Sequence, residues 1–546
     1  MTANTRVNDP DFSLLDDPWI AVRLLDGSDP ELSIRDVFRR AHEIRDIAGE
    51  LPTQDFAVLR LLLAILYRAL GPDITPDAWY AWRERGLPLT RIEEYLDRFA
   101  DRFRLFDPSR PFFQVADLAT AKGEFKDVAP LIFDLPSNNR LFTNRSGDGV
   151  TSLSPGEAAR WLVNAQAFDA SGIKSGALGD DRVKGGKGYP IGIAWTGHLG
   201  GIYAVESTLR GTLLLNLVGA GNGFSLSAGD LPPWEEADPD TAAERWDLVP
   251  RGPVRLFTWQ SRRIRLFARD GRVTGCLVAN GDKLTPQNMH VREPLTAWRY
   301  SEPQTKAAKQ TTYMPREHIP GRALWRGVSA LLPGISQNVP KKDVSVSLPP
   351  PLIGWLDELR DNEYLADGDR VLLRAVGVVY GSNNSVVDEV LFDELLLPYA
   401  LLSESNRALA LVAQDAVALA EEGARAIRQL AENLARAAGG DGEWPGIRAR
   451  DRAYALLDAP YREWLATLTP DKKPLDATDE WKATARRVLA RLGDELVDAA
   501  GPAAWIGREV SRLGASTLVT ASRADSWFRG SLTKTFGTSA GKVEAA

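Results

Sequence analysis

The stretch Asp169–Tyr189 reads DASGIKSGALGDDRVKGGKGY and is the first candidate for the functional segment of the chain. It contains six glycines and four basic residues, and almost nothing that would be buried. Before it, Ser154–Glu157 has the pattern of a capping box that begins a helix. After it, Ile191, Ile193 and Trp195 alternate like a half-buried strand. We therefore expect a flexible loop between two anchored elements.

This glycine-rich loop has two interpretations. Glycine lets the backbone approach a ligand that a Cβ would repel, and lysine favours a ligand rich in phosphate. The alternative is an ordinary solvated surface loop. A Walker A loop is excluded, because Gly188 follows Gly186–Lys187 and Asp181 stands where a glycine is needed.

The length of 546 residues allows two to four domains. The single cysteine, Cys276, excludes an internal disulfide framework and a multi-cysteine zinc site, and it indicates a cytoplasmic protein. No signal peptide pattern is present, and the apolar run Phe56–Leu70 is interrupted by Arg60 and Arg68, so we expect no membrane span. The net charge of −7 argues mildly against nucleic acid, but binding needs only a local basic patch.

The pattern of apolar residues predicts an α+β protein. A large mixed α/β globular domain is expected over residues 1–395 and a C-terminal four-helix bundle over 396–546. The continuous apolar run Gly211–Val218 is typical of a buried strand. Expected helices in the first domain cover 33–46, 53–70, 74–85 and 90–102, and those of the bundle cover 404–438, 446–468, 476–500 and 502–535.

A cluster of seven arginines occupies residues 251–272. Within it, the alternation Arg263-Ile264-Arg265-Leu266 predicts a strand with both arginines on one face, and Asp270–Gly271 predicts a hairpin turn. Such a stripe either contacts phosphates or is simply a solvated strand face. A second hairpin is expected where two apolar runs flank Gly381–Ser385, whose side chains are small, polar and uncharged.

The sequence contains no recognisable catalytic motif. The four histidines, His42, His198, His290 and His318, have no metal-ligand neighbours at helical or strand spacing, and there is no HExxH, GxSxG or Walker A motif. We expect no metal, no cofactor and no enzymatic activity. An undetected metal-dependent nuclease is the enzymatic alternative.

Taken together, these segments resemble the CasA family, the large subunit of the type I-E CRISPR surveillance complex Cascade. The resemblance spans most of the chain and depends on the order and spacing of several segments, followed by the helical bundle. These segments are LLDDPWI (Leu14–Ile20), SGIKSG (Ser171–Gly176), STLRGTLLLNL (Ser207–Leu217), the Trp259 to Arg262-Arg263 strand and VVYGSNNSV (Val378–Val386). Some relatives carry a cysteine zinc cluster, which this chain cannot form.

The resemblance implies a non-catalytic subunit that reads the protospacer-adjacent motif (PAM) of duplex DNA from the minor groove and begins to open the duplex. Its glycine loop would correspond to Ala170–Gly172, with Lys174 beside it. The basic finger that enters the groove would be Lys283 or Asn280. The strand-separating wedge would be Asn383–Asn384, with Asn384 under the last PAM pair. Arg262 and Arg263 would bind DNA phosphates.

The resemblance also implies several partners. The region around Leu141–Gly149 is similar to a loop that docks onto the 5′ end of the guide CRISPR RNA and a neighbouring backbone subunit, with Phe142 as its apolar anchor and Asn144 and Arg145 beside it. The bundle would lie along the backbone and small subunits of the complex and help to hold the displaced strand. The globular domain would receive the helicase-nuclease. The rival hypothesis from another class is a scaffold that binds only RNA or protein.

Overall fold

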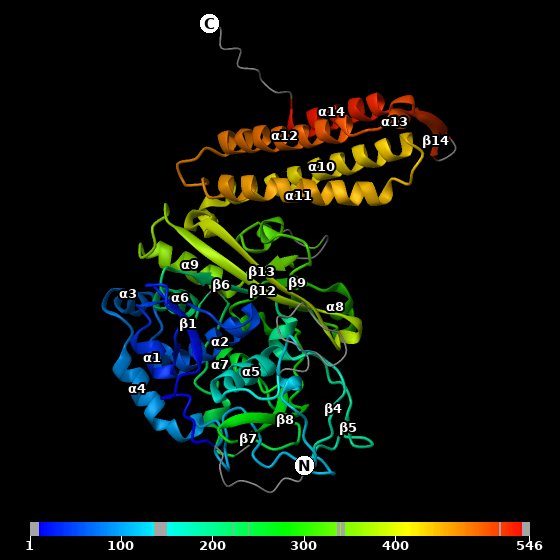
Figure 1. Ribbon diagram of the computed structural model, residues 1–546. Coiled ribbons are helices and arrows are strands. Elements are labelled where there is room, and N and C mark those ends of the chain that lie inside the picture. Colours follow the sequence, from blue (N-terminus) through cyan, green and yellow to red (C-terminus); the bar gives the residue numbers. More distant parts are fainter. Residues whose placement is uncertain are drawn as a thin grey trace. The chain divides into compact units, whose positions relative to one another are not determined.

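The computed structural model describes residues 10–135, 150–221, 223–238, 240–335, 339, 344–512 and 515–537. The chain divides into two compact units (Figure 1). The first comprises Met1–Arg322, Ser336–Leu365 and Val371–Glu394. The second comprises Ala323–Ile335, Ala366–Arg370 and Leu395–Ala546. Mixed small sheets and helices form the first unit and long packed helices form the second, which confirms the α+β prediction.

Helices of the first unit vary widely in length. The α-helices are α1 (Ile34–Arg39), α2 (Pro52–Leu70), α3 (Pro76–Arg85), α4 (Leu89–Arg98), α5 (Pro155–Phe168), α6 (Leu209–Asn216), α7 (Pro253–Phe257), α8 (Glu302–Ala308) and α9 (Pro351–Asp361). The 3-10 helices are η1 (Gly71–Asp73), η2 (Ala100–Phe103), η3 (Ala129–Leu131), η4 (Trp195–His198), η5 (Pro233–Glu235), η6 (Met289–Val291) and η8 (Ser382–Asn384).

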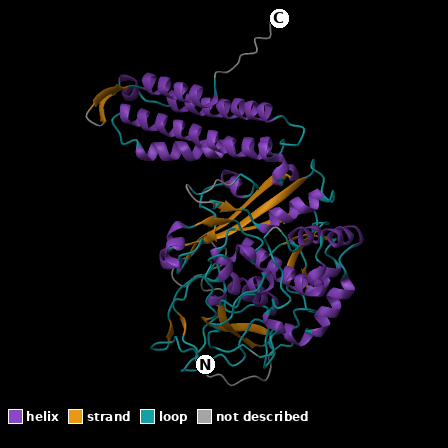
Figure 2. Cartoon of the chain, turned by 180° about the vertical axis from the view of Figure 1, so that it is seen from behind, coloured by secondary structure: helices purple, strands orange, loops and turns teal. Residues whose placement is uncertain are grey.

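The strands of this unit, with the ends of β12 and β13 that belong to the second unit, form several small sheets (Figure 2). Three sheets have three strands each, in the orders β2-β1-β3, β10-β9-β11 and β13-β12-β6, and two further pairs are β4-β5 and β7-β8. The bounds are β1 (Ile20–Leu24), β2 (Glu31–Leu32), β3 (Ile44–Ile47), β4 (Lys174–Ser175), β5 (Lys187–Gly188), β6 (Gly201–Val205), β7 (Arg262–Arg269), β8 (Arg272–Asn280), β9 (Trp298–Tyr300), β10 (Tyr313–Pro315), β11 (Ser347–Leu348), β12 (Arg370–Tyr380) and β13 (Val387–Pro398).

Helix α2 is the centre of the first core. It is buried on nearly every face and packs against α4, α5, α6 and α7. Pro52 occupies its first turn, and the helix ends at Gly71, whose φ of 55° suits a residue without a Cβ. Arg60 lies in the middle of the helix and pairs with Glu293 at 2.9 Å, both side chains being at most 1% exposed. A buried charge of this kind is tolerated because both partners are hydrogen-bonded.

The segment Gly211–Val218 is not the predicted strand, because its main part forms helix α6. Thr208 caps this helix by accepting from the Gly211 amide at 3.2 Å. The helix is buried on all sides, so its sequence shows neither a helical nor a strand period. The Asn216 side chain bonds both polar groups of the Ala204 backbone, which fixes α6 against β6.

The predicted strand around Ile191–Trp195 is also absent. Residues Trp195–His198 form the short helix η4, and the Trp195 amide donates to the Ser261 hydroxyl at 3.0 Å. By contrast, the capping box at Ser154–Glu157 is present in both directions at the start of α5. The predicted hairpin of β7 and β8 is present as well, with Asp270 and Gly271 at φ of 52° and 75° in the turn.

The second unit is built around helix α10, which packs against α11, α12 and α14 (Figure 1). These helices confirm the predicted bundle. The elements are η7 (Leu324–Ala330), η9 (Tyr399–Leu402), η10 (Glu404–Asn406), α10 (Arg407–Ala437), α11 (Glu443–Leu465), α12 (Pro474–Asp498), α13 (Pro502–Ile506), β14 (Arg508–Arg512), β15 (Ala515–Val519) and α14 (Ala521–Phe536).

The last predicted helix, 502–535, is interrupted. A short helix α13 ends at Gly507, and the paired strands β14 and β15 precede α14. Gly507 has a φ of 79°, and a Cβ there would lie 2.3 Å from the Val519 carbonyl oxygen. The chain can therefore turn at this position only with glycine.

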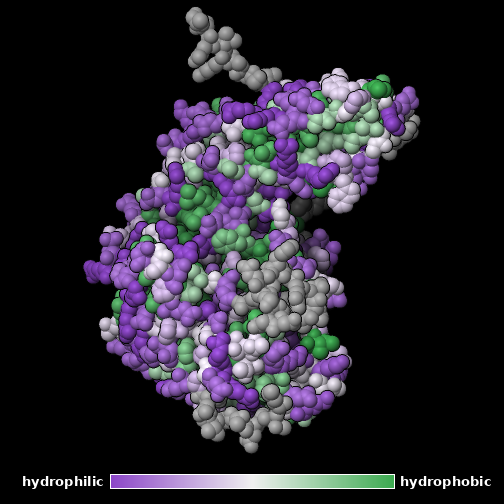
Figure 3. Space-filling model, viewed as in Figure 1, coloured by the Kyte–Doolittle hydropathy of each residue, from purple (hydrophilic) through white to green (hydrophobic). Residues whose placement is uncertain are grey.

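Hydrophilic residues cover most of the face seen in Figure 3, with apolar residues scattered among them. Within the described ranges, no helix combines the length and apolar character that crossing a bilayer demands.

Candidate nucleic-acid interface

The structure brings the glycine loop and the β12–β13 hairpin tip into direct contact. The Ser171 amide donates to the Asn384 carbonyl at 2.8 Å. Asn383 and Asn384 both have positive φ, 54° and 56°, a conformation that asparagine tolerates better than most residues. Their side chains are exposed. Two segments more than two hundred residues apart in the sequence thus form one surface feature.

Asp169, the residue that follows α5, holds this loop through its side chain. Its carboxylate oxygen Oδ2 accepts from Lys174 Nζ at 2.5 Å and from Arg262 Nε. The Arg262 guanidinium also donates to the carbonyls of Asp169, Ala170 and Gly192, at 3.2, 3.0 and 2.9 Å. Burial alone would raise the pKa of Asp169, but the ammonium and guanidinium beside it outweigh this effect and lower that pKa.

Arg262 and Arg263 do not occupy the positions predicted for phosphate contacts. Each side chain is 1% exposed. Arg263 donates to the carbonyls of Thr241 and Ala243 and pairs with Asp282 Oδ1 at 2.6 Å. Because their N–H groups are used inside the protein, the phosphate-binding prediction is corrected to a structural role.

The prediction for Lys174 needs a similar correction. Its side chain is 15% exposed and its ammonium faces Asp169 instead of solvent. Burial lowers the pKa of the Lys174 amine, and the Asp169 carboxylate opposes that shift. Lys174 therefore positions the loop and does not present a free cation.

Asn280 and Lys283, the two alternatives for the basic finger, differ in exposure. Asn280 is 1% exposed, and its side-chain amide donates to the Tyr189 carbonyl at 2.7 Å. Lys283 is exposed, and its backbone amide donates to Glu244 Oε1 at 3.3 Å. Arg182 connects this segment to the glycine loop by donating to the Gly281 carbonyl at 3.0 Å. Lys283 is the one of the pair whose side chain can reach a ligand.

The glycine loop itself is more ordered than predicted, because β4 and β5 pair within it. Gly176 packs so closely on Gly186, the residue before β5, that a Cβ would lie 2.4 Å from the Gly186 carbonyl oxygen. Lys184 and Lys187 are exposed on the same loop. Its glycines thus serve close backbone packing as well as any approach of a ligand.

Two contributors to this surface were not predicted as site residues. Asp169 is the first residue of the loop. Its role could not be predicted without knowing that Arg262 lies opposite its carboxylate. Tyr380 precedes the hairpin tip, and its hydroxyl donates to the Phe168 carbonyl at 2.6 Å. Burial raises the pKa of Tyr380 well above its ordinary value, so the hydroxyl keeps its proton.

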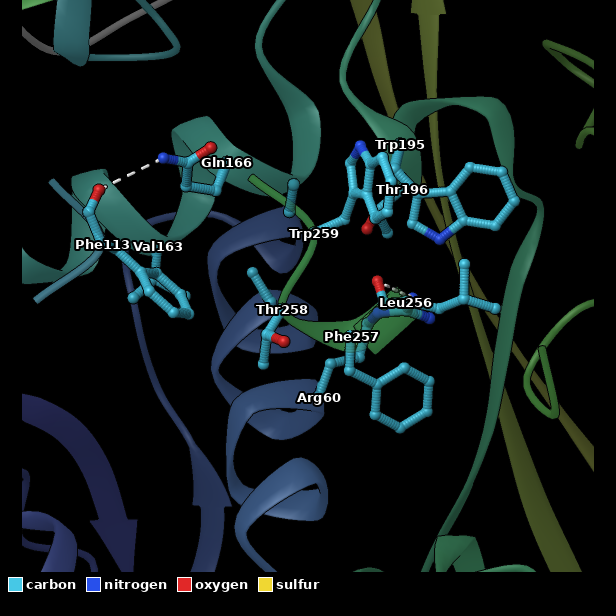
Figure 4. Close-up of a pocket in the computed structure, with 12 residues that line it drawn as sticks. Arg60, Phe113, Val163, Gln166, Trp195, Thr196, Leu256, Phe257, Thr258 and Trp259 are labelled. Atoms are coloured by element: carbon cyan, nitrogen blue, oxygen red, sulfur yellow. Dashed lines mark hydrogen bonds between the residues drawn. The ribbon is translucent and has the colours of Figure 1, made fainter. Parts of the chain in front are cut away.

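The remaining predicted site residues, Phe142, Asn144 and Arg145, lie outside the described residues. A small cavity of the first unit is shown in Figure 4, where Gln166 donates to the Phe113 carbonyl at 3.3 Å. Arg60, Trp195 and Thr258 also line it. Its volume of about 10 Å³ has room for about one water molecule.

In the part of the chain that the structure describes, no three His, Cys, Asp or Glu side chains are grouped to hold a metal ion.

Residues 13–492 match the family described as CRISPR-associated protein Cse1. The chain belongs to the Cse1 family. A curated relative, CRISPR-associated protein CasA/Cse1 from Thermus thermophilus, is 31% identical over 463 residues, which cover 84% of this chain and 82% of the relative. The double name of that relative joins Cse1 to the CasA family that the sequence resembles, so the family prediction is confirmed.

Solved Cse1 structures share the whole fold. Thermobifida fusca Cse1 has a TM-score of 0.89 and 42% identity, over 96% of this chain and 98% of that one. Cse1 from Acidimicrobium ferrooxidans has a TM-score of 0.81 and 29% identity, over 97% and 100%. The Cse1 fold therefore includes both units of the present chain.

Proposed function

We propose that this chain is the DNA-recognition subunit of an RNA-guided surveillance complex, and that it reads the PAM of double-stranded target DNA. Membership of the Cse1 family supports this proposal, and one contact carries it: the hydrogen bond between the Ser171 amide and the Asn384 carbonyl, 2.8 Å long. That bond joins the loop that would face the groove to the tip that would part the strands. The two can therefore act on neighbouring base pairs.

The loop is suited to a close backbone approach. Gly172 has a φ of 144°, and a Cβ there would meet only the Ser385 Cβ, at 4.0 Å. Ala170 is also small, whereas Ser171 is 6% exposed and its amide already donates to Asn384, so Gly172 is the position at which the loop backbone can be approached. The minor groove presents a degenerate pattern of donors and acceptors, and a loop that reads it should accept several related sequences.

Lys283 supplies the positive charge in this proposal. It is exposed, and the segment that carries it is held by the Arg245–Asp282 ion pair at 2.9 Å. A cation held in this way is attracted by the negative potential of a narrow minor groove. Lys174 supports the loop from inside, through Asp169.

The Asn383–Asn384 tip is proposed to separate the first base pair beyond the PAM. Both side chains are exposed and uncharged, and the tip is fixed by the bond to Ser171. Unstacking one base step costs a few kcal/mol. Pairing of guide RNA with the target strand would offset that cost as the duplex opens.

Further partners follow from the family. We propose that the chain assembles with guide CRISPR RNA and with the backbone and small subunits of the complex, and that the region of Phe142, Asn144 and Arg145 docks onto the RNA. It would not catalyse a reaction itself, but would help to recruit the helicase-nuclease.

The wedge is tested in the assembled complex with Asn383→Ala plus Asn384→Ala. We expect strand opening, followed by fluorescence of a 2-aminopurine next to the PAM, to slow by at least about tenfold, equivalent to about 1.4 kcal/mol. Initial binding of duplex should change much less. The variant Asn383→Gly plus Asn384→Gly, which accepts positive φ, should show the same defect, because the amide side chains are missing there too. Equal loss of binding and opening would contradict a wedge.

Lys283→Ala is expected to weaken binding of duplex with a correct PAM by about tenfold, since a specific contact of this kind is worth about 1–3 kcal/mol. Lys122→Ala removes an exposed lysine elsewhere on the same unit and is the matched control. A uniform loss on all DNA would make Lys283 a simple phosphate contact. If none of these substitutions changed the affinity of the complex for DNA, the scaffold hypothesis would be favoured. If the isolated chain cleaved DNA in the presence of divalent cations, the chain would be a nuclease.

A further inference from the structure

A second basic site lies in the irregular segment that follows α4. Arg102 comes from η2, and Arg110 follows a turn in which Asp107 Oδ1 accepts from the backbone amides of Ser109 and Arg110 at 2.9 and 2.7 Å. Both arginines line a small cavity of about 20 Å³. Aromatic side chains complete its wall, and these are Phe112, Phe113 and Trp234.

The two guanidinium groups are not fully used by the protein. Arg102 donates to the carbonyls of Glu236 and Pro233 at 3.0 and 3.4 Å, but its Nε is buried and has no hydrogen-bond partner among the described residues. The Arg110 guanidinium makes no hydrogen bond or ion pair within the described ranges. Burial and the like charge of Arg110 lower the pKa of Arg102, and the carboxylates of Asp101, Asp240 and Glu236 oppose that shift.

One carboxylate, that of Asp240, also lines the cavity, and its buried Oδ1 has an ion-pair partner but makes no hydrogen bond among the described residues. Asp240 Oδ1 lies 3.2 Å from Arg245 Nη1, and Arg245 further pairs with Glu236 and Asp282. Arg255 pairs with Glu236 and Arg263 pairs with Asp282, so three guanidinium groups face these three carboxylates and balance their charge. Arg110 is left as an uncompensated cation beside a second arginine with a free N–H.

We propose that Arg102 and Arg110 form a phosphate-binding site, whose ligand is a phosphate of a nucleic-acid backbone. Guanidinium groups match phosphate oxygens in geometry and bind them through charge-assisted hydrogen bonds. The cavity volume admits one or two oxygen atoms and excludes a base. The aromatic wall lowers the local dielectric and strengthens these bonds. Since phosphates carry no sequence, the site adds affinity without specificity.

Arg110 is the residue to change, because it is half-buried and holds nothing else in place, whereas Arg102 supports the Pro233–Glu236 turn. The variants are Arg110→Gln and Arg110→Lys, with Arg98→Gln on the exposed face of α4 as the matched control. The first arm measures the unfolding temperature of the chain alone in inorganic phosphate and in chloride at equal ionic strength. Because neither DNA nor the other subunits are present, its result does not depend on the proposed function. We expect phosphate to raise the unfolding temperature of the wild type and of Arg98→Gln, but not of Arg110→Gln.

The second arm uses the assembled complex and duplex DNA without a PAM. Arg110→Gln should weaken binding by about threefold to tenfold and reduce the slope of log affinity against log salt by about one. Arg110→Lys should restore most of the slope, because it keeps the charge. A phosphate effect without any effect on nucleic acid would assign the site to free phosphate and would overturn the nucleic-acid ligand. The proposal is overturned if Arg110→Gln behaves like the wild type both in phosphate stabilisation and in DNA binding. It is also overturned if phosphate fails to raise the unfolding temperature of Arg98→Gln.

Discussion

Asp169 is the residue on which the geometry of the candidate site depends. One carboxylate holds Lys174 and Arg262, and Arg262 in turn holds three backbone carbonyls around the loop. Removing one member of a buried ionic cluster leaves the others charged and unpaired, which costs more than the cluster contributes net. The loop that carries Ser171 is therefore stabilised by its own Asp169–Lys174 ion pair together with Arg262, which lies on β7 outside the loop sequence.

This arrangement gives a pH-dependent prediction. Asp169→Asn should destabilise the protein at pH 7 by about 3 kcal/mol. The lowered pKa of Asp169 means that its stabilising effect is complete above the ordinary carboxyl value of 3.8 and is lost as the pH falls through the lower value of the folded state. The difference between the wild type and the variant should thus be constant from pH 7 to pH 5 and shrink below about pH 4.

Urea unfolding at several pH values measures this difference. Asp181→Asn, an exposed acid on the same loop, is the control and should have no such effect. A difference between the wild type and Asp169→Asn that stays constant down to pH 3 would show that the carboxylate charge is not what holds the loop.

Arg262 and Arg263 show where residue-level prediction from this sequence ends. Alternation along β7 correctly indicated a strand, but it does not say which face is covered. The acids that pair with these arginines, Asp169 and Asp282, lie 93 and 19 residues away in the sequence. Their contacts arise only when α5 and the end of β8 are packed against β7. A stripe of arginines is therefore equally compatible with phosphate binding and with a buried network.

At the level of elements, the sequence predicted correctly those features that depend on a few adjacent residues, such as helix caps and turns. The capping box of α5 and the turns at Asp270–Gly271 and Gly381–Ser385 were all predictable, because each depends on a few adjacent residues. Helix α6 was not, since a fully buried helix has no polar face to reveal its period. The contact between Ser171 and Asn384 depends on packing, and the family resemblance implied only that both segments act on the same DNA.

The capping box of α5 provides a prediction at this scale. The Ser154 hydroxyl accepts from the Glu157 amide at 3.2 Å, and the Glu157 carboxylate accepts from the Ser154 amide at 2.8 Å. Ser154→Ala should cost about 1 kcal/mol of unfolding free energy. Glu157→Ala should cost a similar amount, and the double variant less than the sum, because each residue positions the other.

A double-mutant cycle by urea unfolding measures the coupling between the two residues. Ser207→Ala, which changes an exposed serine just before the α6 cap, is the control and should have little effect. Strict additivity of the two single changes would contradict a reciprocal capping box.

At the scale of the whole molecule, the chain does not follow a linear order of domains. The segment Ala323–Ile335 belongs to the unit of the long helices, although it precedes them by some seventy residues. Trp325 is fully buried there, stacks on Tyr461 with ring centroids 4.4 Å apart, and donates from Nε1 to Asp458 Oδ1 at 2.8 Å. Composition suggests only a linear division near residue 396. That division does not include the contribution of Ala323–Ile335 to the second unit.

Trp325 should therefore stabilise the second unit specifically. Trp325→Ala is expected to destabilise that unit by about 3–5 kcal/mol, the usual cost of removing a buried tryptophan. Trp325→Phe, which keeps a ring against Tyr461 but loses the hydrogen bond to Asp458, should cost less. Hydrogen exchange followed by mass spectrometry locates the effect: amides of α10 and α11 should lose protection in Trp325→Ala, while those of the β7–β8 hairpin should not change. Equal loss of protection in both units would mean that the two unfold together, and that the long helices do not form a separate cooperative structure.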